Sequence, residues 1–133
     1  MKRPLRGILV ALVFAQLAGC AGLGGANLTP EERVSKRAQA WADALMEGDW
    51  RTAYTFTSPG YRQSATAGRY HAKVAGAYKW KSAEVREVTC TETSCKVKLI
   101  LEYPAHKSDM DIRRPLTYTW VLSEGEWWLF VPG

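Results

Sequence analysis

Three cysteines are the residues of this chain with the most distinctive chemistry. Cys90 and Cys95 are separated by four residues, whereas Cys20 stands alone near the N-terminus. A redox pair usually has two residues between its cysteines, and no histidine lies near this pair to complete a zinc site. The spacing favours a disulfide that joins two strands of a hairpin, with a redox or metal role as the alternative. Such a bond persists in an oxidising compartment.

Cys20 ends a segment that has the organisation of an export signal. Lys2, Arg3 and Arg6 precede an apolar run over residues 8–17, and small residues follow the run. The run is shorter than the roughly 20 apolar residues that span a bilayer. Two alternatives stay open: an ordinary secretory signal with an incidental cysteine, and a short anchor that is never cut.

The tetrapeptide Leu17-Ala18-Gly19-Cys20 resembles the lipobox of bacterial lipoproteins. The resemblance implies that residues 1–19 are removed and that Cys20 becomes the N-terminus. It also implies that Cys20 carries a diacylglyceryl group and usually an amide-linked acyl chain such as palmitate. Several chains on one residue make the membrane a permanent partner. Ala21, where some lipoproteins have Asp, resembles an outer-membrane address. We therefore expect a periplasm-facing, lipid-anchored protein of the bacterial envelope.

Export also changes the charge of the chain. Removing Lys2, Arg3 and Arg6 from the 18 basic residues leaves 15 against 13 acidic ones, a net charge of +2. So small an excess gives no reason to expect binding to nucleic acid. Residues 20–28 are rich in Gly and Ala, and they predict a short flexible tether.

Residues 29–133 predict one domain that begins with helices. Thr29-Pro30-Glu31-Glu32 has the composition of a capping box with proline in the first turn. An apolar stripe follows, and Gly48 ends the helix. A short helix over 50–56 comes next, then a break at Ser58-Pro59-Gly60, then a helix over 64–78. The stripe consists of Val34, Ala38, Trp41 and Leu45.

The second half of the domain has the alternation of strands. Strands are predicted over 83–89, 95–103, 116–122 and 126–131, with a long loop over 104–114. In the last hairpin, Trp127 and Leu129 occupy one face, whereas Trp128 and Phe130 occupy the other. Both faces are apolar. The second face therefore predicts either a strongly curved sheet or an interface, with a second copy or with another envelope protein.

Two segments carry a resemblance to nuclear-transport-factor-2-like domains. The first runs from Trp41 through Gly48-Asp49-Trp50 to Tyr61-Arg62, and the second is Glu124-Gly125-Glu126-Trp127-Trp128. The resemblance implies an α+β fold in which N-terminal helices pack on a curved, mainly antiparallel four-stranded sheet. It also implies a cone that often holds a pocket and often dimerises. Some members are isomerases or dehydratases, which need a carboxylate or a His–Asp pair in that pocket.

Five aromatic residues are candidates for the wall of such a pocket, and filling the core is their alternative role. They are Trp41, Tyr54, Tyr61, Tyr70 and Trp80. No catalytic residue, metal site or cofactor is predicted, because Asp49 is expected to cap a helix and His71 has no acidic partner at a telling spacing. We expect a non-catalytic binding module that could take a small apolar ligand. The alternatives are an isomerase-like enzyme and a structural subunit of an envelope or secretion assembly.

Overall fold

The computed structural model describes residues 27–133. The export signal predicted over 1–19, Cys20, and the tether up to residue 26 lie outside the described residues. None of the helices in the described part is long and apolar enough to cross a membrane. The helical elements are α1 (Pro30–Met46), α2 (Trp50–Thr55), α3 (Pro59–Ser64), α4 (Ala67–Val74) and the 3-10 helix η1 (Ala77–Lys79). The strands are β1 (Ser82–Cys90), β2 (Ser94–Pro104), β3 (Asp111–Ser123) and β4 (Glu126–Leu129).

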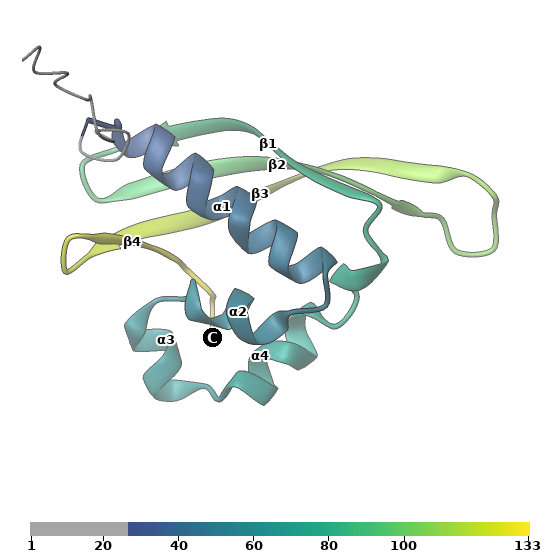
Figure 1. Cartoon of the computed structure of the whole chain (residues 1–133), viewed down its shortest axis with the longest axis horizontal. Helices are drawn as coiled ribbons and strands as arrows, with labels where there is room; N and C mark the ends of the chain where they lie inside the picture. The colour runs from purple at the N-terminus through teal and green to yellow at the C-terminus, as the bar shows by residue number, and fades with distance from the viewer. Residues whose placement is uncertain (1–26) are drawn as a thin grey trace, which may run out of the picture.

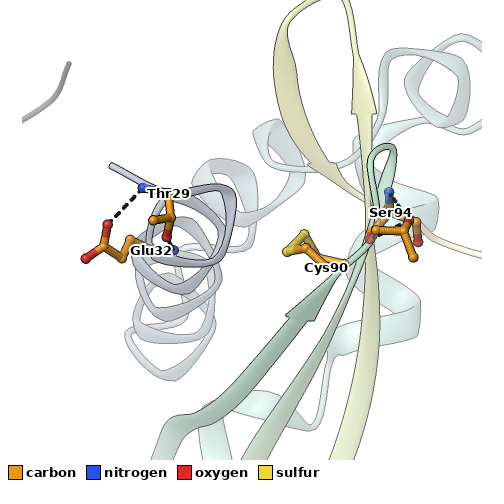
Figure 2. Close-up of a disulfide and its surroundings, with 6 residues drawn as sticks. Thr29, Glu32, Cys90 and Ser94 are labelled. Atoms are coloured by element: carbon orange, nitrogen blue, oxygen red, sulfur yellow. Dashed lines mark hydrogen bonds between the residues drawn. A yellow bond between two sulfur atoms is a disulfide. The ribbon is translucent and has the colours of Figure 1, made fainter. Parts of the chain in front are cut away.

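Helix α1 begins at the predicted capping box. The Glu32 amide donates to Thr29 Oγ1 at 3.2 Å, and the Thr29 amide donates to Glu32 Oε2 at 2.8 Å (Figure 2). All four residues of the predicted stripe are buried, and the helix lies across the sheet (Figure 1). Gly48 then turns the chain with a positive φ of 76°, which glycine adopts without strain. Helices α2, α3 and α4 are grouped below α1 in the view of Figure 1, next to the segment that follows β4.

The sheet is antiparallel throughout, in the order β1-β2-β3-β4. Alternate residues of β2, from Cys95 to Leu101, are fully buried, so this face of the sheet forms the core. Within the sheet, strand β4 pairs with residues 120–123 of β3. Residues 111–118 of β3 therefore form an edge, and Pro115 removes one amide donor from it.

The predicted disulfide joins Cys90 to Cys95. The two residues are directly paired across β1 and β2, and their Cα atoms are 4.0 Å apart (Figure 2). Thr91 and Ser94 close the turn between them, because the Thr91 amide donates to the Ser94 carbonyl at 2.7 Å. The bond fixes the end of the hairpin nearest the start of α1.

One prediction for the helical half is wrong, and one helix was not predicted. The helix predicted over 64–78 is α4 followed by the separate η1, because the chain turns at Gly76 between them. The break predicted at Ser58-Pro59-Gly60 does end the short helix, since α2 stops at Thr55, but an additional helix, α3, begins at once. There Ser58 caps the helix by accepting from the Tyr61 amide at 3.3 Å, and Pro59 occupies the first helical turn.

The long loop predicted over 104–114 is also wrong. Strands β2 and β3 continue to the pair Pro104 and Asp111, which leaves only residues 105–110 as the connection. Figure 1 shows that this hairpin reaches well past the helices. Lys107 adopts a positive φ of 66° in this connection, which places it in the left-handed region.

Candidate ligand-binding cavity

A cavity of about 370 Å³ lies between α1, α4, η1, β3 and the segment that follows β4. Its walls are mainly apolar and aromatic. Trp41 and Leu45 come from α1, Val74 comes from α4, and Phe130 comes from the segment after β4. This volume lies within the range of small-molecule sites.

Two phenols, Tyr70 and Tyr118, are among the polar side chains that line the cavity. The Trp41 indole Nε1 donates to the Tyr70 hydroxyl at 2.7 Å, and both side chains are almost fully buried. Burial raises the pKa of Tyr70 to about 12, against a smaller opposing effect of the hydrogen bond from Trp41. Burial also raises the pKa of Tyr118. Both phenols are therefore neutral at physiological pH and keep an O–H group that can donate.

The rim of the cavity carries a cation. Lys73 extends from α4, and its Nζ donates to the carbonyl of Pro132 at 2.9 Å. This contact ties the last residues of the chain to α4, so that Val131 and Pro132 close one side of the cavity. Strand β4 ends at Leu129, and the wall beyond it is irregular chain.

The five predicted lining residues divide into two groups. Trp41, Tyr70 and Trp80 line the cavity. Tyr54 and Tyr61 do not, because they form a layer behind Tyr70, with ring centroids 5.7 Å and 6.3 Å from it. The Tyr54 hydroxyl donates to the carbonyl of Ala65 at 2.7 Å, so it connects α2 to the end of α3.

Sequence reasoning missed Tyr118, Lys73 and the terminal wall at Val131 and Pro132. Tyr118 could have been found from the sequence. It lies two residues before the buried Trp120 on the same strand and therefore faces the same side of the sheet. No sequence signal indicated Lys73, Val131 or Pro132, because their positions at the cavity depend on how α4 packs against the segment after β4.

The described residues that line this cavity include no aspartate, glutamate or histidine. His71 lies outside it, stacked on Trp50 with ring centroids 4.5 Å apart and an interplanar angle of 14°. Asp49 caps α2 by accepting from the Thr52 amide at 3.0 Å, and hydrogen bonding from Thr52 lowers the pKa of this carboxyl. Residues 27–133 also contain no group of three or more His, Cys, Asp or Glu placed to hold a metal ion.

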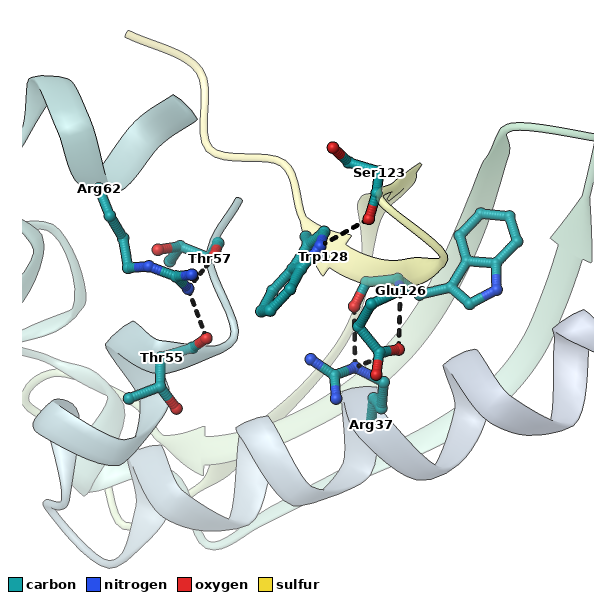
Figure 3. Close-up of polar contacts among 8 residues, drawn as sticks. Arg37, Thr55, Thr57, Arg62, Ser123, Glu126 and Trp128 are labelled. Atoms are coloured by element: carbon teal, nitrogen blue, oxygen red, sulfur yellow. Dashed lines mark hydrogen bonds and ion pairs between the residues drawn. The ribbon is translucent and has the colours of Figure 1, made fainter. Parts of the chain in front are cut away.

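The second face of the last hairpin is partly covered by the chain itself. The Trp128 ring lies between two guanidinium groups, with the Arg37 carbon 5.2 Å and the Arg62 carbon 4.8 Å from the ring centroid (Figure 3). Arg37 also donates from Nε to the Trp127 carbonyl at 2.8 Å. Burial lowers the pKa of the Arg37 guanidinium, whereas Glu126 raises it. Phe130 is 50 % exposed.

Comparison with solved structures identifies the architecture. A Campylobacter jejuni protein named, provisionally, as an NTF2-like transpeptidase superposes with a TM-score of 0.57 at 12 % identity, over 73 % of this chain and 96 % of that one. The fold is NTF2-like. The NTF2-like α+β fold expected from the sequence is therefore confirmed, with helices packed on an antiparallel four-stranded sheet.

Two SEC-C motif-containing proteins have the same arrangement. The one from Psychrobacter arcticus has a TM-score of 0.61 at 14 % identity, over 80 % of this chain and 64 % of that one. The one from Rhodopseudomonas palustris has a TM-score of 0.54 at 13 % identity, over 77 % and 76 %. No protein-family model matches the sequence, and no curated protein is similar to it in sequence. These likenesses concern the fold alone.

Proposed function

We propose that this NTF2-like chain is a non-catalytic binding module of the bacterial envelope, anchored by a lipid on Cys20 and facing the periplasm. Its cavity takes a small apolar ligand. The observation that carries the proposal is the cavity itself, about 370 Å³ of mainly aromatic and aliphatic wall. The lipobox resemblance supports the anchor, and Ala21 supports the outer membrane as its place.

The lining chemistry favours binding over an isomerase-like or dehydratase-like reaction. Such reactions move protons through carboxylates or imidazoles held in the pocket. Among the described residues, the groups that line this cavity are two neutral phenols, two indoles and an ammonium, together with apolar side chains. They hold and orient a ligand, whereas none of them is a carboxylate or an imidazole.

The last hairpin gives less support to the alternative of a structural subunit. Trp127 and Leu129 are buried, and Trp128 is held between Arg37 and Arg62. Of the four residues from 127 to 130, only Phe130 is exposed. A homodimer or an envelope partner at this hairpin stays a prediction, and the size distribution of the purified protein over a range of concentrations tests the homodimer.

The anchor is tested by mass spectrometry of the protein purified from bacterial membranes. We expect the first residue to be Cys20, with the mass of a diacylglyceryl group and an acyl chain, and we expect Cys20→Ser to stay at the precursor mass. A mature chain that begins elsewhere, or that carries no lipid at Cys20, contradicts the anchor.

The cavity is tested with the full chain in phosphatidylcholine nanodiscs and a photoreactive ten-carbon alcohol. We expect saturable labelling of peptides from α4 and β3. Val74→Trp fills the cavity and should abolish this labelling, whereas Leu122→Trp, at a residue that is 37 % exposed, should leave it unchanged. Labelling that never saturates, or that is equal in the two variants, contradicts the proposal.

A further inference from the structure

A second cavity of about 290 Å³ adjoins the first. It lies between η1 and the inner face of the β2–β3 hairpin, and Gly76 and Trp80 line both cavities. Along β3, Tyr118 faces the first cavity, whereas Leu116 and Arg114 face the second. These alternate positions follow one face of the strand over about 14 Å. The two cavities are therefore neighbours along one strand and not separate sites.

The charged residues around these cavities are all cations. Lys73 lies at the first cavity, and Lys79 and Arg114 lie at the second. Among the described residues, no aspartate or glutamate lines either cavity. Residues 27–133 contain four ion pairs, and none of them includes any of these three cations. Within the described chain, therefore, no carboxylate lies within 4.0 Å of the three.

Several side chains of the walls can donate hydrogen bonds. The Tyr118 hydroxyl and the Trp80 indole can each donate, and so can the ammonium and guanidinium groups. A ligand that satisfies them must bring acceptor oxygens, and a negative charge strengthens each bond. The first cavity offers apolar surface for the rest of such a ligand.

We propose that the two cavities together bind one elongated, single-chain anionic amphiphile. Its apolar tail occupies the first cavity, and its carboxylate or phosphate lies between Lys79 and Arg114 in the second. Trp80 contacts the ligand where tail and head meet, because it lines both cavities. This inference rests on the proposed function, since it needs the first cavity to accept an apolar group.

The test uses the full chain in phosphatidylcholine nanodiscs with a photoreactive decanoate. Decanoate, decyl phosphate and decanol serve as competitors. Because the nanodiscs have the same composition for every variant, the amount of probe that partitions into the lipid is the same in each measurement. The charge variant combines Lys79→Gln with Arg114→Gln. The matched control is Lys96→Gln, on an exposed β2 residue whose Nζ donates to Thr119 Oγ1 at 2.8 Å.

We expect saturable labelling of peptides from η1 and β3, and an apparent affinity about tenfold weaker in the charge variant than in Lys96→Gln. Both cations are exposed, so each is assigned a factor of about three. The more potent of decanoate and decyl phosphate identifies the head group.

Two results overturn the inference. If decanol competes as well as both acids and the charge variant labels normally, the ligand is apolar but not anionic, and the proposed function still stands. If neither acid nor alcohol protects the chain, both the inference and the proposed function fail.

Discussion

The buried hydrogen bond between Trp41 and Tyr70 predicts a pH dependence that one substitution should remove. Tyr70→Phe keeps the ring but deletes the hydroxyl that accepts from Trp41 Nε1 at 2.7 Å. The indole donor is then buried without a partner, since Trp41 is 2 % exposed. Leaving such a donor unsatisfied costs about 1–3 kcal/mol, so we expect the variant to be about 2 kcal/mol less stable at pH 7.

The same hydroxyl should make the parent chain sensitive to alkali. The pKa of Tyr70 is about 12 in the fold against 10.0 in the unfolded chain. Because the folded pKa is the higher one, this contribution is fully present below pH 10 and is lost as the pH rises toward 12. The shift corresponds to about 2.7 kcal/mol, of which roughly 1.4 kcal/mol is lost by pH 11. The difference between parent and variant should then narrow from about 2 to about 0.6 kcal/mol.

Urea denaturation at pH 7 and at pH 11, followed by far-UV circular dichroism, measures both differences. Tyr78→Phe is the matched control, because Tyr78 is 62 % exposed and should cost nothing measurable at either pH. A difference between parent and Tyr70→Phe that stays constant from pH 7 to pH 11 refutes the reasoning. It would mean that ionising Tyr70 costs the fold no more than ionising it in the unfolded chain.

Two further predictions concern the β hairpins. Replacing Cys90 and Cys95 with serine releases a loop whose ends are five residues apart, which should lower stability by about 2 kcal/mol and Tm by roughly 10 °C; a fall under about 2 °C argues against this entropic account. Trp128→Leu removes the ring between Arg37 and Arg62, and we expect a loss of about 1–2 kcal/mol in urea denaturation. Phe130→Leu is its control, and equal losses would contradict a specific role for the two guanidinium groups.

The structural elements that could be predicted are those whose conformation depends on residues close together in the sequence. The capping box at Thr29, the stop at Gly48 and the alternation in β2 depend on residues within a few positions, and each lies where expected. The disulfide was predictable for the same reason, since five positions separate its cysteines.

The cavity was only partly predictable, because its walls come from distant parts of the chain. Trp41 and Tyr70 were candidates as aromatic residues, but nothing local separates them from Tyr61, which packs behind Tyr70. The long loop was mispredicted because residues 104–114 are polar. Their cross-strand pairing, which extends to Pro104 and Asp111, decides the conformation there.

The terminal wall of the cavity has a consequence for how fast a ligand enters and leaves. Beyond Leu129, the described chain is held by the Phe130 amide, which donates to the Thr119 carbonyl at 2.9 Å, and by the contact of Lys73 with Pro132. Moving Val131 and Pro132 aside breaks no pair of the sheet ladder. A ligand that enters on this side must break the Lys73 contact and the packing of Val131 against the core, so its residence time should follow the strength of the Lys73 contact.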